Sequence, residues 1–407
     1  MNEEELIKKI ESFNEWEKPY LRLFFSADIV GSTALKQKRG TDASNKPIYP
    51  AWFNTVLAFY HGAEQSFHNN WKEFKTLANG DSSYQHWFGE PPEIWKTVGD
   101  EVLFSKAIRN PTQAVIAIHV WIKTLSNIAE QLKDEHGLSV KSSAWLADFP
   151  VRNQEVILGL SKPAEEDEYP FANHLALASY YANREAKAIR EFIGPSIDTG
   201  FRLGAFSSPR KLVISIELAY MLAVEQSKAE KGDAGYSVGA MSLRNFSFRY
   251  EGKHLMKGVL GGNPYPVFWI DLAPEDPINR TEDAVLDVAK PRAHQVREFA
   301  EAMLEAYKPM IELPYIFSKD GEVSNEFCNI PSEHLHQLID RRELIKKTES
   351  KRETEESMAD QPMDQLDVGS VVGPTPETSS TSSSSATMDW SALRKALENI
   401  ARKREDD

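Results

Sequence analysis

Residues 22–36 read RLFFSADIVGSTALK, and they join a short apolar run to the start of a helix. The apolar run predicts a strand that ends at Asp28, and Gly31, Ser32 and Thr33 predict the first turn of a helix. A carboxylate at a strand end and backbone amides at a helix start can bind a divalent cation and a phosphate together. An aspartate that only caps the following helix produces the same local pattern. This segment therefore leaves a nucleotide site and a structural cap both open.

A second carboxylate follows at the tip of a predicted β-hairpin. Residues 94–106 read IWKTVGDEVLFSK, in which a turn at residues 98–100 joins two apolar segments and carries Asp100. A site for two divalent cations and a triphosphate requires anionic oxygens on two sides, which Asp28 and Asp100 would supply. Lys96 lies on the first strand of the hairpin, where it either faces a neighbouring cleft or is an ordinary solvated lysine.

The composition restricts the class of protein. The 407 residues are 41% hydrophobic, which suits a globular core, and the formal net charge of -14 argues against nucleic acid or an anionic membrane as the main partner. Cys328 is the only cysteine, so an intrachain disulfide is impossible. The first residues lack the apolar core of a signal peptide, and no apolar run is long enough to span a bilayer. We expect a cytoplasmic protein.

The pattern of apolar residues and breakers predicts four regions. These are an N-terminal helix at 1–19, an α/β (α+β) domain at 20–272, a helical extension at 273–347 and a tail rich in Ser, Thr and acidic residues at 348–407. The tail is predicted to be disordered, except for an amphipathic helix near its end at 390–404. Within the domain, residues 171–192 have helical spacing before Gly194 and Pro195 interrupt it. We expect the ordered core to close near Leu272.

Three segments carry a resemblance to a known family. FSADIVGST at 25–33, KTVGDEV at 96–102 and GPSIDTGFR at 194–202 resemble, in this order, the signature segments of class III nucleotidyl cyclases. The similarity covers about residues 20–272. It implies a βαββαβ core in a homodimer that pairs head to tail, with each active site at the interface.

The resemblance also implies a role for individual residues. Asp28, Asp100 and the Ile29 carbonyl would bind two Mn²⁺ or Mg²⁺ ions, beside the phosphate-binding turn at Gly31, Ser32 and Thr33. Lys96 of the second subunit would face the base. Arg202 would stabilise charge on the phosphate in the transition state, and Lys257 would bind the terminal phosphates. Cyclisation of a nucleoside triphosphate is the reaction that these groups suit, because it needs charge stabilisation and no covalent protein intermediate.

Two positions depart from the purine cyclases. Asp198 replaces a usual asparagine and Glu191 occupies the usual base-selecting position, although Lys96 and Glu191 could still recognise adenine. Asp198 either orients the ribose or caps a helix that begins at Thr199. Tyr49 is a candidate for pyrimidine selection because its ring could narrow the pocket and its hydroxyl could bind a carbonyl, but packing on Trp52 is equally compatible.

The details of the motifs most resemble the bacterial pyrimidine cyclases of Pycsar antiphage defence. That resemblance implies conversion of UTP to cyclic UMP, which a separate effector protein would detect. A cyclase that uses CTP or ATP is the first alternative. A protein of another class, which senses nucleotides with a catalytically silent cyclase-like domain, is the second.

Overall fold

The computed structural model describes residues 2–37, 51–78, 84–159, 169–183, 188–230, 236–238, 241–288, 290–317 and 325–359. Met1–Arg352 form one compact unit. Glu353–Asp407 form a second, of which only the end of helix α11 is described. Tyr49 and residues 390–404 lie outside the described residues, so the predictions made for them stay predictions.

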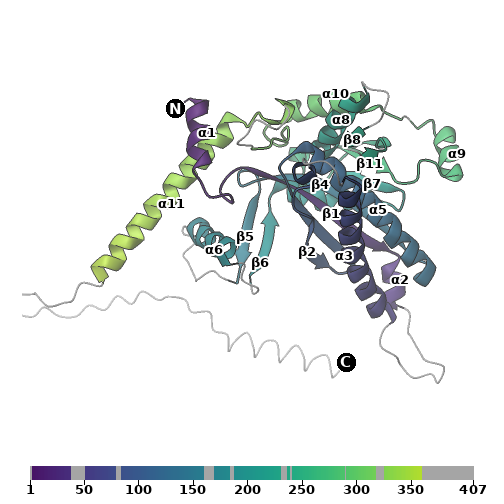
Figure 1. Ribbon diagram of the computed structural model, residues 1–407, viewed down its shortest axis with the longest axis horizontal. Coiled ribbons are helices and arrows are strands. Elements are labelled where there is room, and N and C mark those ends of the chain that lie inside the picture. The colour runs from purple at the N-terminus through teal and green to yellow at the C-terminus, as the bar shows by residue number, and fades with distance from the viewer. Residues whose placement is uncertain are drawn as a thin grey trace, which may run out of the picture. The chain divides into compact units, whose positions relative to one another are not determined.

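A seven-stranded sheet organises the first unit (Figure 1). Its strand order is β10-β11-β7-β4-β1-β3-β2, and every neighbouring pair is antiparallel except β4 and β7. The strands are β1 (Tyr20–Val30), β2 (Glu93–Val98), β3 (Glu101–Ile108), β4 (Ser139–Phe149), β7 (Lys211–Ile214), β10 (Phe248–His254) and β11 (Tyr265–Asp271). Residues 22–30 form most of β1, which lies between β3 and β4, and residues 31–36 form the following turn and most of helix α2 (Ser32–Gln37).

The predicted βαββαβ core is present. Three helices follow β1 along the chain before β2 begins: α2 (Ser32–Gln37), α3 (Ala51–Leu77) and α4 (Tyr84–Phe88). Helix α5 (Pro111–His136) connects β3 to β4. Gly137 ends α5 in the left-handed conformation, at φ 64°, as a C-terminal glycine commonly does. The apolar faces of α3 and α5 pack on one face of the sheet, where Phe25 contacts Phe67 and Trp121. The mixed α+β fold class is thereby confirmed.

The opposite face of the sheet carries a small arm, formed by β5 (Gln154–Leu158), α6 (Tyr169–Asn183), β6 (Ile189–Ile193) and α7 (Pro195–Leu203). Figure 1 shows β5 and β6 as a pair beside α6, outside the main sheet. The helical pattern predicted over 171–192 is wrong in its second half, because α6 ends at Asn183 and β6 begins at Ile189. The physical reason is tertiary: residues 189–193 pair along their whole length with β5.

The C-terminal part of the compact unit extends the same core beyond Leu272, where we expected it to close. Helix α8 (Ile216–Glu230) packs against α10 (Ala293–Ala306), whose Val296 and Leu304 are fully buried. Helix α9 (Pro277–Val285) is attached by Asp283, which accepts hydrogen bonds from Arg210 and Arg249. Short elements complete the fold: β8 (Tyr236–Val238), β9 (Met241–Leu243), and the 3-10 helices η2 (Gly204–Phe206), η3 (Leu260–Gly262) and η4 (Asn325–Phe327).

Two helices that are more than 300 residues apart in the sequence pack together. Helix α1 (Glu3–Glu11) contributes Leu6 and Ile10 to a small apolar cluster with Leu335 and Leu338 of α11 (Ser332–Ala359). Helix α11 continues past residue 348, where we expected the disordered tail to begin. No helix among the described residues is long and apolar enough to cross a membrane.

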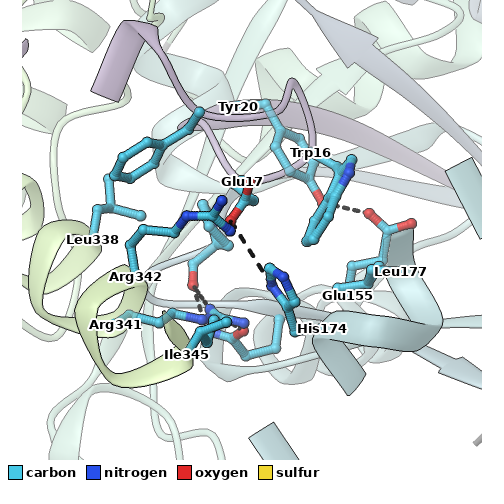
Figure 2. Close-up of a pocket in the computed structure, with 13 residues that line it drawn as sticks. Trp16, Glu17, Tyr20, Glu155, His174, Leu177, Leu338, Arg341, Arg342 and Ile345 are labelled. Carbon is cyan, nitrogen blue, oxygen red and sulfur yellow. Dashed lines mark hydrogen bonds and ion pairs between the residues drawn. The ribbon is translucent and has the colours of Figure 1, made fainter. Parts of the chain in front are cut away.

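Figure 2 shows the junction at which α11 meets the arm. Arg342 of α11 and His174 of α6 both contact the carboxylate of Glu17, which lies just before β1. The cavity between them measures about 20 Å³, enough for roughly one water molecule. This junction therefore attaches α11 to the arm.

Candidate active site

Asp28 lies near the end of β1 and faces Lys141 of β4. The two residues are register partners across the strand pair, and Lys141 Nζ lies 3.0 Å from Asp28 Oδ2. Asp28 does not cap helix α2, because it lies inside the strand and α2 begins only at Ser32. Burial raises the pKa of the Asp28 carboxyl, the neighbouring carboxylate of Asp100 adds to the rise, and Lys141 opposes it.

Asp100 is at the tip of the β2–β3 hairpin, as predicted, and this tip rests on the start of α2. The Ser32 hydroxyl donates a hydrogen bond to Asp100 Oδ2, and Lys36 Nζ donates to Oδ1 at 2.8 Å. Burial acts to raise the pKa of Asp100, but these hydrogen bonds outweigh it and hold the pKa below its usual value. The Ile29 N–H also donates to the Asp100 carbonyl, at 3.4 Å. The fold therefore brings Asp28, Ile29, Ser32 and Asp100 together.

We define the carboxylate cluster as Asp28, Asp100, Lys36 and Lys141. Its carboxylate oxygens are ligands that suit hard divalent cations. Mg²⁺ is usually bound in proteins by one or two carboxylates together with water and substrate phosphates. Two carboxylates are what the cluster offers, and no group of three or more His, Cys, Asp or Glu side chains suited to a metal occurs in the described parts of the chain. Both carboxylates are paired with flexible ammonium groups, which a cation could replace.

The turn between β1 and α2 has the conformation that its sequence requires. Gly31 adopts φ 90°, a left-handed conformation that other residues rarely tolerate. Ser32 is buried, whereas Thr33 is exposed. Ser32 uses its hydroxyl to hold Asp100, a contact that the sequence did not predict.

Lys96 and Glu191 meet across the arm. Lys96 Nζ, on β2, donates hydrogen bonds to both carboxylate oxygens of Glu191, on β6, at 2.8 and 2.9 Å. Their side chains are 31% and 27% exposed, so both remain accessible from solvent. We expected these residues to act on the same base, and the fold brings them into contact within one chain.

Arg202, Asp198 and Lys257 form a third group around α7. The Nε of Arg202 donates to the main-chain carbonyl of Lys257, and NH1 donates to the carbonyl of Asp198 at 3.1 Å. The expectation that Asp198 caps a helix starting at Thr199 is wrong, because α7 begins at Pro195 with Gly194 at its N-cap. Proline and the conformationally free glycine start the helix one turn earlier. Asp198 is consequently an exposed residue within the first turn, and Lys257 is exposed as well.

Sequence reasoning missed Lys36 and Lys141. Neither lies in a recognised motif, and Lys141 meets Asp28 only through the pairing of β1 with β4. The one local signal is the spacing of Lys36 four residues after Ser32 in a helix, which puts both on one face.

Comparisons with known proteins give a weak likeness. No protein-family model matches the sequence, and no curated protein matches it. Among solved structures, the adenylyl cyclase CyaB from P. aeruginosa is 14% identical with a TM-score of 0.37, over 62% of this chain and 94% of that one. The guanylate cyclase domain of RhGC from Catenaria anguillulae, in complex with GTP, is 13% identical with a TM-score of 0.33, over 62% and 97%. The guanylyl cyclase Cya2 is 12% identical with a TM-score of 0.34, over 64% and 96%. The assignment of a function therefore rests on the residues of this chain and their geometry.

Proposed function

We propose that this chain is a nucleotidyl cyclase that converts a pyrimidine nucleoside triphosphate, UTP in the first place, into its 3′,5′-cyclic monophosphate and pyrophosphate. The observation that carries the proposal is that two carboxylates lie side by side, Asp28 near the end of β1 and Asp100 at the hairpin tip. Each forms an ion pair with a lysine, Asp28 with Lys141 and Asp100 with Lys36, which a divalent cation would replace. The three sequence motifs support it, because none of their charged residues is buried.

Asp28, Asp100 and the Ile29 carbonyl would hold two divalent cations, Mn²⁺ or Mg²⁺. Such ions would lower the pKa of the ribose 3′-hydroxyl and neutralise the leaving pyrophosphate. In the reaction the 3′-hydroxyl would lose its proton to solvent and its oxygen would bond to the α-phosphorus, while the bond from that phosphorus to the oxygen that bridges it to the β-phosphorus breaks and pyrophosphate leaves. Arg202 would stabilise the charge on the phosphoryl oxygens, and Lys257 would bind the terminal phosphates.

The base would bind at Lys96 and Glu191, which supply a donor and an acceptor. In the proposed homodimer, these two residues and Arg202 of one copy face the carboxylate cluster of the other. Two half-sites from different copies then make one complete site, so the monomer alone should be inactive. Size-exclusion chromatography with light scattering, run alongside activity against protein concentration, tests this part of the proposal.

Incubation of the purified protein with Mn²⁺ or Mg²⁺ and each of the four ribonucleoside triphosphates tests the activity. We expect cyclic UMP as the dominant product by liquid chromatography and mass spectrometry. The Asp28→Asn variant should lose the activity. Glu251→Gln is a matched control, because Glu251 also pairs with a lysine at similar exposure, 34% for Glu251 and 28% for Asp28. Absence of any cyclic product from the wild-type protein would refute the proposal.

A second candidate is an adenylate cyclase. The contact between Lys96 and Glu191 favours it, because a lysine can donate to adenine N1 while a carboxylate accepts from the N6 amine. Cyclic AMP as the dominant product would select this candidate over the pyrimidine cyclase. If the protein binds a nucleotide but converts none of the four triphosphates, the result would instead favour a non-catalytic nucleotide sensor.

The proposed biological role is signalling in Pycsar antiphage defence, in which a separate effector detects the cyclic pyrimidine nucleotide. The motifs at 25–33 and 194–202 support it by resemblance. Measurement of cyclic UMP in cells that express the chain, before and after phage infection, tests this role. An unchanged level, together with no protection by the chain and its genomic neighbours, would refute it.

A further inference from the structure

Two aromatic rings enclose the ammonium group of Lys96. Its Nζ lies 4.2 Å from the centroid of the Trp95 ring and 5.5 Å from that of Phe201. The two rings are 6.0 Å apart at 48°. Phe201 is 37% exposed, although a large apolar side chain gains free energy from burial. The donor that would bind the base therefore lies beside an accessible aromatic ring that sequence reasoning did not single out.

Phe201 is held at this position by its neighbours in α7. A Cβ added to Gly200 would lie 2.2 Å from the Trp145 ring, so only glycine allows the helix to approach β4 this closely. The Phe201 ring itself packs 5.7 Å from the ring of Trp145. On its other side in the sequence, Arg202 is fixed by hydrogen bonds to Asp198 and Lys257. The close approach of Gly200 fixes the backbone of α7 at this point, and the contacts with Trp145 and Trp95 hold the Phe201 ring beside Lys96.

We propose that Phe201 is a wall of the base pocket and selects a one-ring base over a two-ring base. A base that binds Lys96 and Glu191 must lie within hydrogen-bond reach of both, and Phe201 limits the room beside Lys96. A pyrimidine ring can meet the Phe201 ring edge to face or offset. In the proposed site the ribose is held at the carboxylate cluster, and the hydrogen-bonding edge of a purine lies one fused ring further from the ribose than that of a pyrimidine. A purine would therefore bring this edge against Phe201, whereas the shorter pyrimidine fits in front of it. This inference rests on the proposed function and names the part of the site that sets its substrate class.

The experiment compares kcat/KM for UTP, CTP, ATP and GTP among four proteins: wild type, Phe201→Ala, Phe201→Tyr and Tyr250→Ala. We expect Phe201→Ala to raise the ratio of purine to pyrimidine kcat/KM by about 10-fold or more, since differences in pocket size discriminate on that scale. Phe201→Tyr keeps the ring and should keep the ratio. Tyr250 is a matched control, because it is also 37% exposed and packs on other rings, those of Phe268 and Phe299.

A merely structural role for Phe201 would have a different signature. Displacement of Arg202 would lower kcat for all four substrates by the same factor and leave the ratios unchanged, which would overturn the proposal. Wild-type protein that prefers ATP or GTP would also overturn it. If Phe201→Ala does not fold, Phe201→Leu takes its place, with an expected change in the same direction.

A binding measurement separates this inference from the proposed function. The dissociation constants of non-cyclisable 3′-deoxy UTP and 3′-deoxy ATP are measured by calorimetry for wild type and Phe201→Ala. If Phe201→Ala lowers the preference for the UTP analogue over the ATP analogue, the result supports the role of Phe201 as a wall of the base pocket. Wild-type protein that binds neither analogue and makes no cyclic product overturns both proposals. Wild-type protein that cyclises UTP, with a variant of unchanged preference, overturns only the role of Phe201.

Discussion

The two ends of strand β1 carry charge in different ways, although alternate side chains of the strand face the same side of the sheet. At the end that carries Asp28, the ion pairs use lysines, and their side chains are 22 to 33% exposed. At the start of the strand, Arg22 and Arg190 both contact Glu93, and Arg190 also binds Glu155, which is only 3% exposed. Tyr20 adds its hydroxyl to Glu155, a contact visible in Figure 2.

We interpret the ion pairs around Glu155 as a structural network and those of the carboxylate cluster as an exchangeable network. Arginine forms fixed forks with carboxylates and suits buried pairs, whereas lysine is a mobile point charge on a long stem. The Glu155 network attaches the arm, and with it Glu191, to the sheet. The carboxylate cluster is partly open to water, and under the proposed function its lysines would leave the carboxylates when a divalent cation binds. Aromatic residues around Phe24, including Trp145 and Phe192, separate the two ends.

The largest expected effect comes from breaking the structural network. Glu155→Gln removes the charge beside the mostly buried Arg190 and should lower the free energy of unfolding by about 3 to 5 kcal/mol. Chemical denaturation followed by circular dichroism measures it. The control is Glu251→Gln, whose exposed pair should contribute less than about 1 kcal/mol. Equal losses in the two variants would contradict the distinction between the two ends.

Asp100→Asn breaks the exchangeable network and should affect activity more than stability. The substitution keeps the shape of the side chain but removes the charge that a cation needs, so turnover should fall by about 10²- to 10³-fold, the range seen when one electrostatic group is lost. Initial rates of cyclic nucleotide formation measure this change. A variant with normal turnover would show that the hairpin tip is not part of the active site.

A buried ring nitrogen provides a third case for comparison. His119 of α5 stacks on Phe246, its Nε2 is buried without a hydrogen-bond partner among the residues that the structure describes, and burial lowers the pKa of the ring to about 4. In the unfolded chain the His119 ring binds a proton below about pH 6.5, whereas in the folded chain it does so only near pH 4. The free energy of unfolding therefore decreases as the pH falls from about 6.5 to 4. We expect a loss of up to about 3 kcal/mol over this range.

His119→Phe should remove that part of the pH dependence, because phenylalanine cannot bind a proton. Denaturation curves at pH 7 and pH 4.5 for the wild type and the variant measure the difference. If the free energy of unfolding decreases equally between pH 7 and pH 4.5 in both proteins, groups other than His119 cause the acid sensitivity.

The smallest effect is expected for the lysines of the carboxylate cluster. Lys36→Met and Lys141→Met each break a partly exposed ion pair, and such pairs contribute about 0 to 1 kcal/mol to stability. The melting temperature should therefore change by only a few degrees in either variant. A loss as large as that of Glu155→Gln would mean that these lysines are structural and do not exchange with cations.

Prediction from sequence succeeded where local rules decide the structure. The hairpin at 94–106, helix α5 between Pro111 and Gly137, and the strand that carries Asp28 follow from apolar periodicity and turn residues, although this strand continues to Val30 instead of ending at Asp28. It failed for β6, where residues 189–193 continue a helical pattern but pair with a strand more than thirty residues earlier. It also failed at Asp198, because Gly194 and Pro195 start α7 before the predicted cap.

The sequence by itself determined which residues we propose for the chemistry. Asp28, Asp100, Lys96 and Arg202 stand in motifs whose residue types and order are readable along the chain, and Glu191 lies three residues before the third motif. Only the tertiary structure decided their partners. Lys141 reaches Asp28 through strand pairing, Lys96 reaches Glu191 through the folding of the arm, and Phe201 reaches Lys96 because Gly200 lies against Trp145. Contacts of this kind join residues that are tens to more than a hundred positions apart, and they depend on packing that no local pattern encodes.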